Sequence, residues 1–144
     1  MNDFRIFTDG SYRSSKDQGG IGVLWLKDGK EVQRFSKGFK HTTNNQMELL
    51  AIKAALVSIK KPIESLEIVS DSEYSIGVLT KNWKPKKNIE LINSIKKLLK
   101  EKQELVNTPI LFVHTRGHQT DDSEFTKYNN ICDELAQTIS NSIL

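Results

Sequence analysis

FRIFTDGS, residues 4–11, is the stretch that decides the fold. Its residues alternate with the period of two that a pleated strand requires, and the run then meets a carboxylate, Asp9, and a glycine, Gly10. Asp is depleted in strands, whereas glycine lets a backbone turn sharply or approach a ligand closely. Two interpretations are open: a strand that ends in an ordinary Asx turn, and a strand end that carries a metal-binding carboxylate. The second interpretation needs other carboxylates in similarly unusual positions.

The composition is that of a globular domain in a reducing compartment. The chain has 144 residues, of which 37% are hydrophobic and 27% charged, which suits one domain with a true core and excludes disorder. No apolar run approaches the ~20 residues that cross a bilayer, and no secretory signal is visible. The single Cys132 cannot form an intrachain disulfide. We therefore expect a single domain over residues 1–144 that is cytoplasmic, monomeric and not associated with a membrane.

Lysines concentrate in residues 81–102. This segment holds eight lysines and two glutamates, in a chain whose net charge is only +3. A local basic region favours a polyanionic partner such as nucleic acid. A solvated, lysine-rich helix face is the alternative, and charge alone does not decide between the two.

The first third of the chain predicts an antiparallel meander. Asp28 and Gly29 supply the positive φ of a tight hairpin, and Val32 and Phe35 are the apolar members of the returning strand. The segment 12–18 is polar and is predicted to be a loop. The three predicted strands cover residues 4–9, 23–26 and 31–39, and residues 19–22 lead into the second.

Helical periodicity then alternates with two further strands. Thr43 and Gln46 have the spacing of a capping box, so a helix is expected to begin there and to run to about Ile59, and Asn88 can cap a later helix. The other predicted elements are strands at 66–70 and 109–113 and helices at 73–80, 89–102 and 125–143. Crossovers through helices imply parallel pairing. We therefore expect an α/β fold with one mixed five-stranded sheet, an antiparallel three-strand meander plus two parallel strands, flanked by helices on both faces.

Four carboxylates occupy comparable positions in these elements. Asp9 and Asp71 follow apolar strands, Glu48 lies near the start of a helix, and Asp133 adjoins the buried stripe of the last helix. Four clustered carboxylates would repel one another and would require cations. Oxygen ligands without Cys or His suit Mg²⁺ or Mn²⁺, and two such ions about 3.5–4 Å apart would activate a water and stabilise the leaving oxygen of a phosphodiester. The pattern alone leaves it open whether the four converge.

The chain resembles the type 1 ribonucleases H over nearly its whole length. The residues that carry the resemblance are Thr8-Asp9-Gly10-Ser11, Gly19-Gly20, Thr42-Thr43-Asn44-Asn45-Gln46-Met47-Glu48-Leu49, Ser70-Asp71-Ser72, Gly117-His118 and Cys132-Asp133-Glu134-Leu135-Ala136. The resemblance implies the ribonuclease H-like fold, and it implies that the four carboxylates hold two Mg²⁺ ions, with Mn²⁺ as a possible substitute. It also implies cleavage of the RNA strand of an RNA–DNA hybrid, leaving 5′-phosphate and 3′-hydroxyl ends.

The same resemblance assigns helper and substrate-binding residues. His118 would assist near the attacking water or the leaving product, and a solvated loop histidine is the alternative. Asn44 and Asn45 can recognise hydroxyls and phosphates and Thr43 would help to bind a DNA-strand phosphate, although plain helix capping also accounts for these residues. For Trp83, a place in the core is the alternative. The predicted substrate-binding residues are Gly10, Ser11, Thr43, Asn44, Asn45, Gln46, Ser72, Glu73, Trp83, Lys84, Lys86 and Lys87.

Three departures from the family pattern bear on the binding of a hybrid, and one of them, Glu73, would either weaken binding or shift the metal dependence. The basic protrusion of many bacterial members is reduced to residues 84–87, Glu73 stands where many relatives have glutamine, and the loop 12–18 lacks the usual Asn-Pro-Gly composition. Two competing hypotheses are a DNA nuclease of the same fold and a hybrid-binding module with a weakened site. The absence of an added DNA-recognition domain argues against the first, and the presence of all four acids argues against the second.

Overall fold

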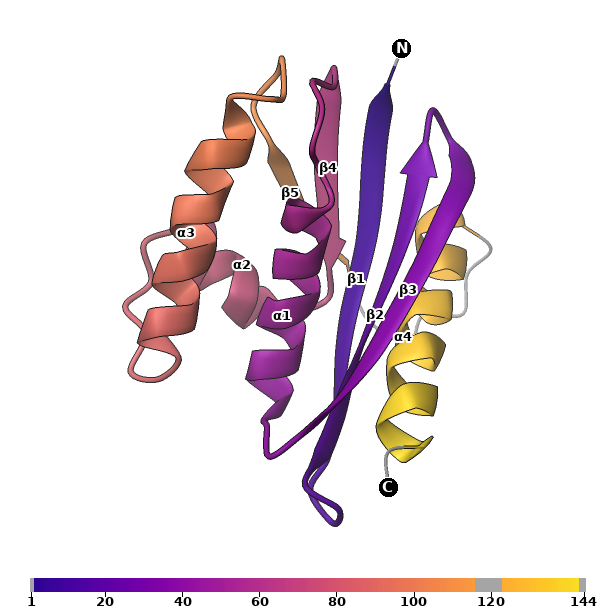
Figure 1. Ribbon diagram of the computed structural model, residues 1–144, viewed down its shortest axis with the longest axis vertical. Helices are drawn as coiled ribbons and strands as arrows, with labels where there is room; N and C mark the ends of the chain where they lie inside the picture. Colours follow the sequence, from indigo (N-terminus) through magenta and orange to yellow (C-terminus); the bar gives the residue numbers. More distant parts are fainter. Residues whose placement is uncertain (1, 116–122, 143–144) are drawn as a thin grey trace.

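The computed structural model describes residues 2–115 and 123–142 (Figure 1). Within these residues five strands and four helices follow one another in the predicted order. The strands are β1 (Asp3–Arg13), β2 (Gln18–Lys27), β3 (Lys30–Lys40), β4 (Ser65–Ser70) and β5 (Leu111–His114). The helices are α1 (Asn44–Val57), α2 (Glu73–Thr80), α3 (Ile89–Gln103) and α4 (Glu124–Ser142).

β1 lies at the centre of the sheet, whose strand order is β3-β2-β1-β4-β5. It pairs antiparallel with β2 and parallel with β4, and β4 pairs parallel with β5. The predicted mixed sheet is therefore confirmed. Because β1 has a strand on each side and helices on each face, Ile6 and Phe7 are both fully buried although they are consecutive and point to opposite faces.

The helices cover the two faces unequally. Figure 1 shows α1, α2 and α3 on one side of the sheet and α4 on the other. Ile6 joins the larger core beneath α1 and α3, together with Ile52 and Ile92. Phe7 joins a smaller core beneath α4, together with Tyr128. Two helices that approach β1 from opposite faces can thus bring side chains to one strand.

The strands differ from the predicted ones at their ends. β1 continues to Arg13 and β2 begins at Gln18, because these two residues pair with each other, so the predicted polar loop is shorter than 12–18. Val32 and Phe35 are 56% and 39% exposed, since β3 forms the edge of the sheet. Within the described ranges, no helix is long and apolar enough to cross a membrane.

Two helices begin at the predicted residues, but only the first of them has the predicted side-chain cap. The hydroxyl of Thr43 accepts the N–H of Gln46 at 3.2 Å, which confirms the capping of α1. Asn88 does stand at the N-terminal cap of α3, with a left-handed φ of 62°, but its side chain makes no capping hydrogen bond. The predicted cap is therefore wrong in its chemistry, because the side chain is engaged elsewhere.

Candidate active site

Asp9 lies inside β1 and not at its end. It pairs with Gly22 of β2, and the strand continues through Gly10, so the Asx-turn interpretation is wrong. On its other side β1 runs parallel to β4, and the hydroxyl of Thr8 donates to the carbonyl of Val69 at 2.9 Å. β4 ends beside this point, and the chain after it places Asp71 next to Asp9.

Glu48 reaches the same point from α1, in the layer above the sheet. The N–H of Gly10 donates both to Asp9 Oδ1, at 2.9 Å, and to Glu48 Oε1. A Cβ on Gly10 would lie 2.4 Å from the backbone nitrogen of Glu48, so only glycine allows α1 to lie this close to β1. Gly10 was predicted to contact substrate, and the structure gives it this packing role at the site.

Asp9, Glu48 and Asp71 form a compact group of carboxylates. One oxygen of each lies within 4.8 Å of the others. Asp9 Oδ2 and Asp71 Oδ1 are buried and have no hydrogen-bond partner among the residues that the structure describes. A buried carboxylate oxygen without a hydrogen-bond donor destabilises the folded protein unless a cation binds it. An all-oxygen set with two oxygens left open fits Mg²⁺ or Mn²⁺.

The electrostatics of the group agree with this fit. Burial raises the pKa of Asp9 to about 9, and the charge of Asp71 contributes to the same shift. Burial also raises the pKa of Glu48 well above its usual range, with the charge of Asp9 as the next cause. Without a cation Asp9 therefore retains its proton at neutral pH, whereas a divalent cation would favour its ionised carboxylate.

Asp133 approaches Asp9 from α4, on the opposite side of the sheet from Glu48. It contributes to the raised pKa of Asp9, so the two interact, but it does not belong to the group of three within 4.8 Å. Both of its carboxylate oxygens lie within hydrogen-bond distance of Gln137 Nε2, at 3.1 and 3.0 Å. The structure thus brings three of the four predicted carboxylates together and places the fourth beside Asp9.

Two residues that support the site were not predicted from the sequence. A Cβ on Gly22 would lie 2.3 Å from the carbonyl oxygen of Cys132, so Gly22 lets α4 lie directly on β2 and brings Asp133 near Asp9. A glycine inside a strand is a signal of such close approach. Gln137 stands one helical turn after Asp133, a spacing that places both side chains on one helix face.

The predicted substrate-binding residues lie around the N-terminus of α1 and along the chain from α2 to α3. Thr43, Asn44 and Asn45 are exposed, and Gln46 and Ser11 are half-buried. Beyond β4, Ser72 is buried at the cap of α2, where its hydroxyl accepts the N–H of Ser75. The other predicted residues of this part of the chain are exposed, namely Glu73, Lys84, Lys86 and Lys87.

Trp83 packs on α2 and is not a core residue. Its side chain is 41% exposed, so the core alternative is wrong. A Cβ on Gly77 would lie 2.1 Å from the indole ring, and Lys81 Nζ lies 5.8 Å from the ring centroid. The indole therefore rests on a glycine and keeps part of its surface open.

The predicted helper His118, with Gly117 before it, lies outside the described residues. A second histidine, His114, lies at the end of β5, and its Nε2 lies 3.2 Å from the backbone carbonyl oxygen of Asp71. This contact links the end of β5 to the segment that carries one of the three carboxylates.

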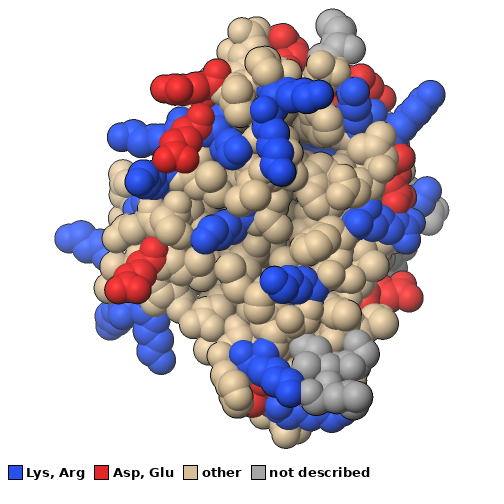
Figure 2. Space-filling model, in the orientation of Figure 1, with Lys and Arg blue, Asp and Glu red and all other residues tan. Residues whose placement is uncertain are grey.

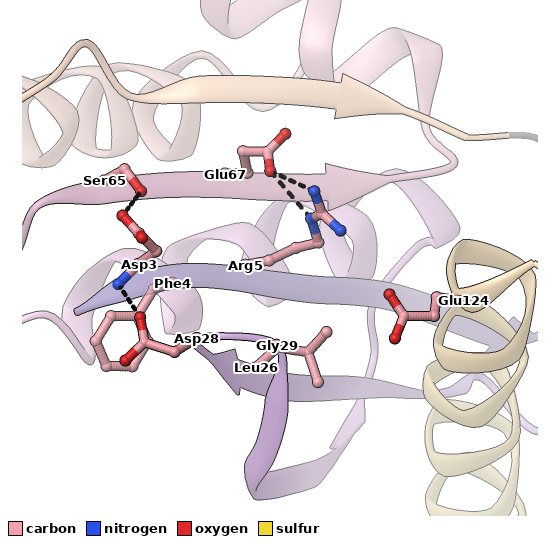
Figure 3. A pocket seen from close by; sticks show the side chains of 9 residues that line it. All are labelled: Asp3, Phe4, Arg5, Leu26, Asp28, Gly29, Ser65, Glu67 and Glu124. Carbon is pink, nitrogen blue, oxygen red and sulfur yellow. Dashed lines mark hydrogen bonds and ion pairs between the residues drawn. The ribbon is translucent and has the colours of Figure 1, made fainter. Parts of the chain in front are cut away.

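A groove of about 560 Å³ lies at the other end of the strands and is not this site (Figure 3). Two pairs of its polar side chains bind each other: Arg5 pairs with Glu67 at 2.8 Å, and Ser65 donates to Asp3 at 2.6 Å. Figure 3 shows these partners side by side on β1 and β4, at the beginning of the strands. The groove therefore offers no group of open ligands comparable to that around Asp9.

Positive side chains are spread over the face that Figure 2 presents. Figure 2 shows Lys and Arg side chains along the side where Figure 1 places α3, a helix that carries Lys96, Lys97, Lys100 and Lys102 against two glutamates. The lysine-rich segment predicted from the sequence thus forms part of an exposed surface, as either of its two interpretations requires.

Comparison with known proteins gives one consistent result. Residues 1–141 match the family described as RNase H. The chain is 37% identical to Ribonuclease H of Actinobacillus pleuropneumoniae, over 99% of this chain and 93% of that protein. It is 36% identical to Ribonuclease H of Clostridium botulinum, over 94% of each chain. Among solved structures, LC11-RNase H1 superposes with a TM-score of 0.75 at 25% identity, covering 98% of this chain and 97% of the other. LC11-RNase H1 has also been solved in complex with an RNA/DNA hybrid, and that structure superposes with a TM-score of 0.76 at 24% identity, covering 96% and 97%.

Proposed function

Because this chain belongs to the RNase H family, we propose that it hydrolyses the RNA strand of RNA–DNA hybrids. The products would be 5′-phosphate and 3′-hydroxyl ends, and residues 1–144 would act as one domain. The observation that carries the proposal is the group of Asp9, Glu48 and Asp71, with two buried oxygens that have no partner among the described residues.

Asp9, Glu48, Asp71 and Asp133 would hold two Mg²⁺ ions, for which Mn²⁺ could substitute. Bound there, two divalent ions would supply an activated water and a positive charge at the leaving oxygen. The N–H of Gly10 donates to both Asp9 and Glu48, which supports this proposal because it holds the two carboxylates side by side. Asp9 would be central to this set of ligands, since it interacts with Glu48, Asp71 and Asp133.

The α1 N-terminus supports recognition of the hybrid. Asn44 and Asn45 are exposed there, within one turn of Glu48, and amide side chains can both donate to and accept from a ribose 2′-hydroxyl. Thr43 caps the helix with its hydroxyl and would also help to bind a DNA-strand phosphate. Capping and substrate binding are compatible because a hydroxyl both donates and accepts.

The remaining predicted residues would extend the contact or assist the reaction. Lys84, Lys86, Lys87 and Trp83 would follow the DNA strand, and Ser11, Ser72 and Glu73 would lie near the cleaved strand. His118 would assist at the attacking water or the leaving product, a role that suits an imidazole because it exchanges protons near neutral pH.

The deciding experiment is a gel assay of an RNA–DNA hybrid labelled on either strand, with Mg²⁺, with Mn²⁺ and with EDTA. We expect cleavage of the RNA strand alone, dependent on either ion. Duplex DNA and duplex RNA of the same sequence are the matched substrates. Cleavage of duplex DNA would favour the DNA nuclease of the same fold, and binding of hybrid without turnover in either ion would favour the binding module.

A further inference from the structure

Gln46 connects the helix that carries Glu48 with the lysine-bearing segment between α2 and α3. Its Oε1 accepts from the hydroxyl of Thr42 at 3.0 Å, and its Nε2 donates to Asn88 Oδ1 at 3.2 Å. Thr42 is only 8% exposed, so its hydroxyl is a fixed anchor. Both polar atoms of the Gln46 amide are therefore engaged within the protein.

The side chain of Asn88 binds Gln46 and does not cap its own helix. An asparagine at a helix N-terminal cap normally accepts a hydrogen bond from the first turn of its own helix. Here its backbone carbonyl accepts from Ile92 at 2.8 Å, but its side chain makes no cap and binds Gln46 instead. Its φ of 62° is a conformation that asparagine tolerates better than most residues.

The contact forms one wall of a cavity of about 410 Å³ between α1 and the start of α3. Gln46 lines it from α1, and Lys86, Lys87, Asn88 and Glu90 line it from the other side. Both lysines are exposed, so the cavity opens beside two positive charges. Gln46 precedes Glu48 by two residues, and the link therefore joins the lysines to a carboxylate of the site through one turn of helix.

We propose that Gln46 is a positioning residue that holds Lys86 and Lys87 in register with the carboxylates, so that both lysines bind phosphates of the strand opposite the one cleaved. This inference rests on the proposed function, because it assumes that a hybrid lies across the site. It revises the expectation that Gln46 itself contacts the substrate. A short segment of this kind has little structure of its own, and two lysines contribute to binding only where the segment is fixed.

A double-mutant cycle distinguishes the two roles of Gln46. Gln46→Leu removes both hydrogen bonds and keeps much of the volume, whereas Asn88→Gly removes only the far partner and suits a positive φ. Each would be combined with Lys86→Ala/Lys87→Ala in the catalytically inactive Asp9→Asn protein. Binding of a labelled hybrid would be followed by fluorescence anisotropy from low to moderate salt, with Lys60→Ala, beyond the C-terminus of α1, as the control.

If Gln46 positions the lysines, Gln46→Leu and Asn88→Gly should each weaken binding about three- to tenfold, the factor expected for one net hydrogen bond, and together no more than either alone. Binding weakens as salt rises, and removing both lysines should make the slope of log K against log salt less steep by about 1–2 in the parent protein. In either variant the same removal should change the slope by clearly less. Lys60→Ala should leave the slope unchanged.

Other results would overturn the inference. If Gln46→Leu weakens binding while Asn88→Gly does not, Gln46 contacts the hybrid directly. The link has no positioning role if both variants bind the hybrid as tightly as the parent protein. The same holds if removing the lysines weakens binding equally in the parent protein and in both variants. Thermal unfolding of each variant separates loss of folded protein from loss of affinity. A parent protein that binds no hybrid would overturn the proposed function together with this inference, whereas binding without coupling overturns this inference alone.

Discussion

Asp9→Asn should abolish cleavage of a hybrid and, in the absence of divalent cations, make the protein more stable. The substitution keeps the shape of the side chain and an oxygen for the N–H of Gly10, which now binds Asp9 Oδ1 at 2.9 Å. It removes a buried carboxyl group that, without a cation, must keep a proton beside Glu48 and Asp71. The new amide N–H₂ also gives the neighbouring carboxylates a donor. Loss of cleavage and gain of stability thus both result from replacing the Asp9 carboxyl group with an amide.

The magnitude follows from the pKa of Asp9, which rises from an ordinary 3.8 to about 9 in the folded protein, chiefly because of burial. Between these values the folded protein keeps a proton that the unfolded chain has lost. The free energy of unfolding therefore falls as the pH rises through this window. At about 1.4 kcal/mol per pH unit the penalty at pH 8 has an upper limit of roughly 6 kcal/mol, and relaxation of the site reduces it. We expect Asp9→Asn to gain about 2–4 kcal/mol at pH 8 and less than about 1 kcal/mol at pH 5.

Urea unfolding followed by circular dichroism, in EDTA from pH 5 to pH 9, measures this difference. Glu101→Gln, which removes an exposed carboxylate of α3, is the control and should leave the pH dependence unchanged. Added Mg²⁺ should stabilise the parent protein in proportion to RT ln(1 + [Mg²⁺]/Kd) and should act weakly on Asp9→Asn. An Asp9→Asn protein that is less stable than the parent at pH 8, or a difference equal at pH 5 and pH 8, would refute the reasoning.

Three further substitutions test the surroundings of the site. Gly22→Ala would place a Cβ 2.3 Å from the carbonyl of Cys132 and should push α4 outward, lowering kcat at least tenfold and stability by about 1–3 kcal/mol in steady-state and urea measurements. Glu73→Gln removes an exposed charge that repels phosphates and should lower KM about two- to threefold at low salt with kcat unchanged; an unchanged KM would place Glu73 away from the hybrid. Trp83→Ala should raise KM about three- to tenfold by removing a stacking surface, with little change in melting temperature because the side chain is 41% exposed. A large loss of stability would show instead that the indole mainly packs on Gly77.

The sheet could be predicted because its signals are local. The alternation in residues 4–8, the Asp28-Gly29 hairpin turn and the helical spacing after Thr43 each depend on nearby residues. Crossover rules then leave few arrangements for the later strands. The end of β1 could not be predicted, because whether Tyr12 and Arg13 extend the strand depends on partners in β2.

The site could be predicted only in part, for a similar reason. Strand and helix patterns place Asp9, Glu48 and Asp71 on their elements, but their distances depend on how closely those elements pack. That closeness is set by Gly10 and Gly22, whose absent side chains leave little trace in a hydrophobic pattern. The link from Gln46 to Asn88 joins residues 42 positions apart and has no local signature.

The alternation of β1 explains why carboxylates from two layers meet at one strand. Gly10 faces α1, and its lack of a Cβ lets Glu48 approach from that side. The preceding residue, Asp9, points to the opposite face, where Gly22 lets α4 bring Asp133 close. A slip of one residue in the pairing of β1 would turn Asp9 toward α1 and put its Cβ where α1 now lies. The register that buries Ile6 and Phe7 in separate cores is therefore the same register that assembles the site, so that core packing and the geometry of the site are specified together.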